Sequence, residues 1–212
     1  FTMLKRIAVL AIVLSCSVSV LADYIADRQA GMKLVKARKH QEAMAAFLKM
    51  AAGKVSEPQK ADALEQAAMC AQRLKDMKLA LELAAKIPIE AASKTVQMRL
   101  IQGTGKRAEV IAKFKDEDFS KWPEKYAGEA FYIRGECYYS LRKGVQAEED
   151  LKEALKNLAR GYSRSCAQLT LAQNYQRNLK DNAKALETYL EGVKKNRDAY
   201  GWLSMTCVTS AA

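Results

Sequence analysis

The chain has 212 residues and a formal net charge of +11, from 35 lysines and arginines against 24 aspartates and glutamates. Hydrophobic residues make up 50% and charged residues 28%, a balance that excludes an intrinsically disordered polar chain. Ten glycines and three prolines are too few for collagen, a proline-rich linker or a turn-dense all-β fold. A single histidine excludes most multi-histidine metal sites.

The N-terminal segment, residues 1–22, has the features of an export signal. Lys5 and Arg6 precede an apolar run, and Val20 and Ala22 are small enough for the pockets of a signal peptidase. The apolar stretch is shorter than the roughly 20 residues of a membrane-spanning helix, and serines dilute it. We therefore expect cleavage after Ala22 and an exported protein, either periplasmic or secreted.

A second processing route stays open. Residues 13–16 end in Cys16 and resemble the lipobox of bacterial lipoproteins, in which the cysteine becomes lipidated. Leu14 stands where that motif usually has a small or β-branched residue, so the match is imperfect. The alternative to simple cleavage is therefore a lipoprotein anchored through Cys16.

An exported chain would carry four cysteines, an even number in an oxidising compartment. The four are Cys70, Cys137, Cys166 and Cys207. Their spacings are wide, no CxxC motif occurs, and the first three lie in helical apolar patterns, where cysteine packs as a small hydrophobe. We expect buried free thiols, and the sequence leaves the disulfide state open.

From residue 23 onward, apolar residues recur with the period of an α-helix, and short polar turns separate the stretches. In the first pair, Ala30 and Leu34 lie on one stripe, and Ala43 and Phe47 lie on the next. Equivalent alanines of successive second helices follow one another after 37, 28, 39 and 38 residues; these are Ala43, Ala80, Ala108, Ala147 and Ala185. A period in the thirties indicates a helical solenoid rather than a single bundle.

The helices also carry small and large residues in a fixed order. The sets are Gly31 and Leu34 followed by Ala43 and Phe47, Gly135 and Tyr138 followed by Ala147, Leu151 and Ala154, and Ala172 and Tyr175 followed by Ala185, Tyr189 and Gly192, the last with one extra residue in the turn. This order resembles that of the tetratricopeptide repeat (TPR) family over about residues 23–195, and the segment 89–114 departs from it. The resemblance implies an all-α fold, an α-solenoid of about five stacked antiparallel helical hairpins, in an exported bacterial TPR-like protein.

The expected organisation is a signal peptide (1–22), N-terminal TPR-like hairpins (23–114), a linker loop (115–123), C-terminal TPR-like hairpins (124–195) and a capping tail (196–212). In the loop, Phe119 and Trp122 are expected to tuck against the stack. In the tail, Tyr200, Trp202 and Leu203 are expected to form a short capping helix.

Signals for catalysis are sparse. Gly105 and Lys106 suggest a phosphate-binding loop, but Arg107 stands where a serine or threonine would bind magnesium. The acidic stretch 116–118 lacks the glycine and the distal glutamate of a calcium-binding loop. His40 lies in a turn between two predicted helices, where a structural role fits it better than catalysis. We therefore predict no catalytic residues, no metal, no cofactor and no enzymatic activity.

In the TPR family, the inner face of each first helix presents the side chains that contact a ligand. By this resemblance, the partner-binding residues are Arg28, Met32, Lys36, Glu65, Met69, Arg73, Tyr132, Glu136, Tyr139, Gln173 and Arg177. Aromatic, methionine and arginine side chains suit adaptable peptide binding. Tyr132 and Tyr139 have a second interpretation, in which they pack between repeats.

These observations favour a non-enzymatic scaffold of the cell envelope that binds a protein or peptide on its concave face. The alternative is a structural adaptor that self-associates through convex or end surfaces, and an enzyme that uses the groove as a substrate cradle comes last. The basic residues are spread along the chain, which indicates a solvated surface or a weak attraction to anionic envelope surfaces. An exported protein is not expected to bind nucleic acid, and the partner's identity and the oligomeric state stay open.

Overall fold

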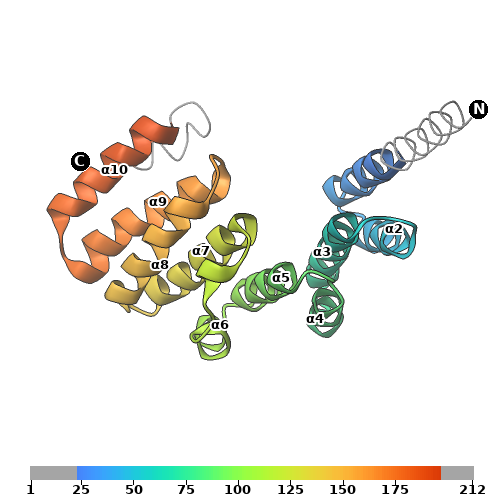
Figure 1. Cartoon of the computed structure of the whole chain (residues 1–212), viewed down its shortest axis with the longest axis horizontal. Coiled ribbons are helices and arrows are strands. Elements are labelled where there is room, and N and C mark those ends of the chain that lie inside the picture. Colours follow the sequence, from blue (N-terminus) through green and yellow to red (C-terminus); the bar gives the residue numbers. More distant parts are fainter. Residues whose placement is uncertain (1–22, 197–212) are drawn as a thin grey trace, which may run out of the picture. The chain divides into compact units, whose positions relative to one another are not determined.

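The computed structural model describes residues 23–196, and within this range every regular element is a helix (Figure 1). The all-α prediction is thereby confirmed. The predicted signal peptide with Cys16, the tail from residue 197 on and Cys207 lie outside the described residues. The chain divides into two compact units, one up to Leu100 and the other from Ile101, and antiparallel helical hairpins build both.

The first unit contains a helix over residues 23–36, followed by α2 (His40–Ala52), α3 (Glu57–Arg73) and α4 (Met77–Ala85). The next helix, α5 (Glu90–Gly103), begins in this unit and passes its boundary. Ser56 starts α3 with a capping box, in which the Gln59 side chain accepts the Ser56 backbone N–H at 2.9 Å. Buried alanines from α2, α3 and α4 fill the seams between these helices, and such small side chains allow close packing.

The second unit contains the C-terminal end of α5 and a further series of helices. These are α6 (Arg107–Phe114), the 3-10 turn η1 (Phe119–Lys121), α7 (Glu124–Ser140), α8 (Gly144–Asn157), α9 (Tyr162–Asn174), the π-helical turn η2 (Tyr175–Leu179) and α10 (Asn182–Asn196). The α7–α8 hairpin packs closely because Gly135 faces Leu151. A β-carbon on Gly135 would lie only 2.9 Å from Leu151 Cγ, so this small-large pair of the sequence pattern is a direct contact.

Each second helix buries its fourth residue. Alanine has this place in α2, α4, α8 and α10, as the sequence predicts. In α6 the fourth residue is Val110, which is buried, whereas Ala108 is exposed. The prediction that Ala108 corresponds to the buried alanines of the other second helices is therefore wrong, and Val110 has that place. With Val110 in its place, the intervals become 30 residues from Ala80 and 37 residues to Ala147.

The segment between α6 and α7 is docked through aromatic rings, which confirms the expectation for Phe119 and Trp122. Phe119 is fully buried, and its ring centroid lies 4.7 Å from that of Trp122 and 5.2 Å from that of Phe131. The Arg134 guanidinium lies 4.2 Å from the Phe119 ring centroid, in a cation–π contact.

Arg134 is itself buried and donates to two parts of the chain, α8 and the segment 114–117 at the end of α6. Its Nε and Nη2 donate to the two carboxylate oxygens of Asp150 in α8, at 2.7 and 2.8 Å. Its Nη1 donates to the backbone carbonyls of Phe114 and Glu117, at 3.1 Å each. One side chain of α7 therefore holds both α8 and the segment that follows α6.

We expect Arg134→Met to lower the free energy of unfolding by about 3–5 kcal/mol, because it leaves the Asp150 carboxylate buried without its partner. Combining Arg134→Met with Asp150→Leu removes both charges and should recover part of this loss. Urea denaturation followed by circular dichroism measures both variants. If the double variant is no more stable than the single one, the ion pair does not have the role assigned to it.

The three cysteines that the structure describes are free thiols, and Cys70 and Cys137 are buried while Cys166 is half-buried. Burial raises the pKa of Cys137 to about 12, and the neighbouring negative charge of Glu136 adds to the shift. Cys137 therefore stays protonated in the folded chain at pH values where an unfolded thiol is ionised.

This difference makes stability depend on pH. Above about pH 9 the unfolded chain binds fewer protons than the folded chain, so the free energy of unfolding falls as the pH rises toward 12. We expect the free energy of unfolding of Cys137→Ala to fall less steeply with pH, whatever the effect of the substitution on absolute stability. The difference in slope corresponds to at most one bound proton per molecule. Urea titrations across this pH range measure the slope, and parallel curves for the two proteins would rule out a contribution from Cys137.

Candidate functional site

In the first unit, side chains of consecutive first helices are joined by hydrogen bonds between residues 34 positions apart. Arg28 Nε donates to Asp62 Oδ2 at 2.6 Å, and Arg99 Nη1 donates to Glu65 Oε1 at 2.7 Å. The Tyr24 hydroxyl, which the sequence analysis missed, also donates to Asp62 Oδ2, at 2.6 Å. Burial and the Asp62 carboxylate together raise the pKa of Tyr24. Arg28 and Glu65 thus contribute to the stacking of the repeats.

The second unit repeats this spacing. Gln102 Nε2 donates to Glu136 Oε2 at 2.7 Å, and the Tyr139 hydroxyl donates to Gln173 Oε1 at 3.4 Å, again with 34 positions between partners. The first helices therefore keep a regular 34-residue period. The period includes α5, which lies in the segment 89–114 that departs from the sequence pattern.

The other predicted binding residues have varied surroundings. Met32 and Met69 are half-buried, and Lys36 and Arg73 are exposed. Tyr132 is half-buried on α7, and its hydroxyl interacts with the Cys166 thiol of α9. Burial is the main cause that raises the pKa of Tyr132, and Glu136 contributes further. These contacts fit the interpretation in which Tyr132 packs between repeats.

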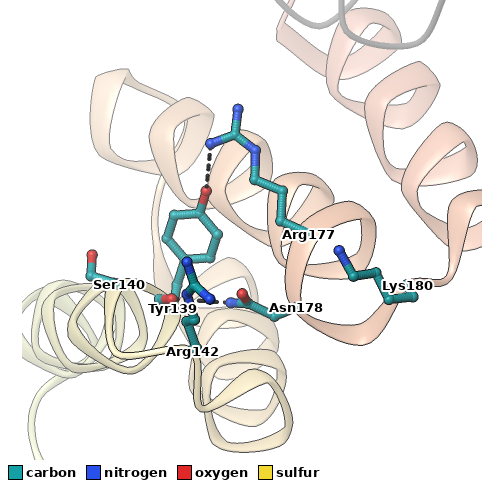
Figure 2. Close-up of a pocket in the computed structure, with 6 residues that line it drawn as sticks. All are labelled: Tyr139, Ser140, Arg142, Arg177, Asn178 and Lys180. Atoms are coloured by element: carbon teal, nitrogen blue, oxygen red, sulfur yellow. Dashed lines mark hydrogen bonds between the residues drawn. The ribbon is translucent and has the colours of Figure 1, made fainter.

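Tyr139 borders a cavity of about 580 Å³ in the second unit (Figure 2). The lining residues come from the end of α7, the turn after it, η2 and the residue that follows η2; they are Tyr139, Ser140, Arg142, Arg177, Asn178 and Lys180. Arg177 Nη1 donates to the Tyr139 hydroxyl oxygen at 3.2 Å, and Asn178 Nδ2 donates to the Tyr139 carbonyl at 3.0 Å. Two predicted residues, Tyr139 and Arg177, thus meet at one cavity.

The π-helical turn η2 places Arg177 and Asn178 at this cavity. A π-helical turn contains more residues than an α-helical turn, which accounts for the extra residue noted in the sequence. Asn174 is fully buried, donates to the Gly144 carbonyl at 2.8 Å and accepts from Asn178 at 2.9 Å. A β-carbon on Gly144 would lie 2.8 Å from Leu179 Cδ2, so glycine permits this close approach of η2.

Three cations and no carboxylate line the cavity. Within residues 23–196, Arg142, Arg177 and Lys180 form no ion pair. Of the three, only Arg177 was predicted from the sequence, because Arg142 and Lys180 belong to turns that connect the helices. Both have a left-handed backbone, with φ of 59° and 58°. The site can therefore donate several charge-assisted hydrogen bonds to an anionic group.

Solved structures with the same fold are TPR proteins. A thermophilic TPR protein of Thermus thermophilus matches with a TM-score of 0.59 and 20% sequence identity, over 88% of this chain and 97% of that one. A Podospora anserina protein described as a kinesin light chain, with nearly identical TPR-like repeats, matches with a TM-score of 0.51 and 21% identity, over 81% of this chain and 93% of that one. The chain therefore has the TPR-like α-solenoid fold that the sequence resemblance predicts.

No protein-family model matches the chain, and no curated protein matches its sequence. Among the described residues, no helix is both long and apolar enough to cross a bilayer. The same residues contain no group of three histidine, cysteine, aspartate or glutamate side chains placed to hold a metal ion. The comparisons thus show the fold alone.

Proposed function

We propose that the chain is a non-enzymatic scaffold of the cell envelope that binds an acidic segment of a protein partner. The observation that carries the proposal is the cavity beside Tyr139, where Arg142, Arg177 and Lys180 meet without a carboxylate. Arginine presents a planar set of donors that matches a carboxylate, and charge-assisted hydrogen bonds are stronger than neutral ones. The TPR-like fold commonly mediates contacts between proteins, and repeat stacks of this kind offer extended binding surfaces.

The existing hydrogen bonds decide which groups a partner would contact. The Tyr139 hydroxyl already donates to Gln173 and accepts from Arg177, so its ring is the group that remains for apolar contact. Arg177 uses one N–H on Tyr139 and keeps the others. A bound acidic segment would therefore be held by three cations and would pack on one aromatic ring.

The envelope location rests on the sequence alone. The basic start, apolar run and small residues of segment 1–22 support export and cleavage after Ala22, and anchoring through Cys16 is the alternative. A periplasmic or secreted scaffold would hold its partner outside the cytoplasm.

Replacing both cavity arginines, Arg142→Gln with Arg177→Gln, should weaken binding of a short glutamate-rich peptide at least about tenfold, because each hydrogen bond to a charged group contributes about 1.5–3 kcal/mol. Fluorescence anisotropy with this peptide, and with its glutamine counterpart, measures the effect. The charge-matched control is Lys152→Gln with Lys156→Gln, two exposed positions of α8. Equal binding of the two peptides, or equal weakening in the control, would count against the proposal.

A second candidate function is a structural adaptor that self-associates through an end surface. On α10, Leu186 and Leu190 lie four positions apart and are 44% and 57% exposed, which gives a second copy an apolar stripe to cover. If this surface mediates association, Leu186→Gln with Leu190→Gln should turn a dimer into a monomer in sedimentation velocity. A wild-type protein that stays monomeric at the highest soluble concentration would exclude this candidate.

A further inference from the structure

Four non-glycine residues in the described part of the chain have a left-handed backbone, and all four are basic. They are Arg38, Lys75, Arg142 and Lys180, with φ between 58° and 64°. Each lies in the turn between a first helix and its second helix, and Gly105, with φ of 82°, has the same place in the remaining hairpin. Four of these five turns therefore hold a lysine or arginine where the backbone favours glycine.

Fold stability does not explain why lysine or arginine, rather than glycine, has these four positions. The left-handed conformation brings a β-carbon close to a carbonyl oxygen, so a lysine or arginine is less stable there than glycine. Gly105 shows that the turn accepts glycine. Arg38, Lys75, Arg142 and Lys180 are all exposed. The four turns thus present cations to the surroundings at a cost to the backbone, and an external anionic partner would account for them.

Exposed apolar side chains lie in the same turns or at the start of the helix that follows. In the first unit, Leu74 immediately precedes Lys75 and is 43% exposed. In the second unit, Leu141 and Val145 lie on either side of the basic pair 142–143 and are 37% and 58% exposed. A single exposed hydrophobic residue is ordinary. Here, however, both units repeat the same combination of a cation and an apolar side chain in one turn.

Within the described part of the first unit, the acidic residues near the turns form no ion pair with Arg38 or Lys75, the two cations whose backbone is left-handed. Glu42 pairs with Lys39, with 3.3 Å between the carboxylate and the ammonium group. Asp76 accepts a backbone N–H at the start of α4. Neither carboxylate forms an ion pair with Arg38 or Lys75 within residues 23–196. Taken together, residues 37–39 and 74–76 hold three cations and one carboxylate, so the two turns keep a net positive charge as a set, although Lys75 and Asp76 balance each other.

We propose that the turns between first and second helices bind the surface of a bilayer that contains anionic phospholipids. Headgroup phosphates attract lysine and arginine, and an adjacent leucine or valine can enter the interfacial layer. An acidic protein or a soluble polyanion would also attract the cations, but it would not need exposed Leu74, Leu141 and Val145 beside them. Arg142 and Lys180 also line the cavity beside Tyr139, whereas Leu74, Leu141 and Val145 do not. The proposal therefore goes beyond the peptide site through these three apolar residues and through Arg38 and Lys75 of the first unit.

Co-sedimentation of the full chain with vesicles tests the proposal. We expect the protein to sediment with vesicles of phosphatidylcholine and phosphatidylglycerol more than with phosphatidylcholine alone, and less as salt is added. All variants are compared in the same full chain, so that residues 1–22 contribute equally to each. Equal sedimentation with the two kinds of vesicle would overturn the proposal.

The charge is tested by Arg38→Gly with Lys75→Gly. Glycine suits the left-handed backbone at both positions, so a loss of binding cannot be attributed to unfolding. Partitioning to anionic vesicles should fall about fivefold for each cation removed. The control, Lys60→Gln with Lys78→Gln, removes the same charge from exposed positions of α3 and α4 and should change partitioning less. Equal losses in the two variants would show that only net charge matters and would overturn the assignment to the turns.

The apolar contribution is tested by replacing Leu74, Leu141 and Val145 together with serine. This variant keeps every charge, so its binding to inorganic polyphosphate, measured by calorimetry, should match that of the wild type. Its partitioning to anionic vesicles should fall several-fold. A serine variant that binds vesicles as well as the wild type does would overturn the proposal and assign the turns to a soluble acidic partner.

Discussion

A single buried guanidinium organises the second unit. Arg134 lies in α7 and donates to the Asp150 carboxylate in α8 and to carbonyls at the end of α6 and in the segment after it. A buried charge is tolerated when it is paired and its donors are satisfied, so this pair fixes where α8 and the docked segment lie against α7. The same helix carries Tyr132, Glu136 and Tyr139, and the candidate site therefore depends on this ion pair for its geometry.

Hydrogen bonds between first helices determine which polar side chains remain for a partner. Arg28, Glu65 and Glu136 are each hydrogen-bonded to a neighbouring first helix, and each is partly buried, so they serve the stacking of the repeats. Arg142 and Arg177 are exposed and form no ion pair within the described residues. The recognition site that we propose for the second unit therefore lies at the turn end of the hairpins rather than at the middle of the first helices.

Much of the fold could be predicted because the helical period and the order of small and large residues reflect local packing. The contact between Gly135 and Leu151 is one result of that order. The choice of Ala108 failed because residue type alone does not fix helix register. Val110 lies two positions on, about 200° around the helix, and only burial distinguishes the two. The cavity could not be predicted, because turn residues such as Arg142 and Lys180 converge only through the path of η2.

The π-helical turn also makes the site adjustable. Removing one residue from η2 would restore an α-helical register after Asn174, and each residue of an α-helix advances by about 100°. If the removed residue preceded Arg177, this side chain would turn by about 100° relative to Tyr139. Variation in length at this one turn would therefore let closely similar chains acquire different ligand preferences while every residue of the hairpin core stayed the same.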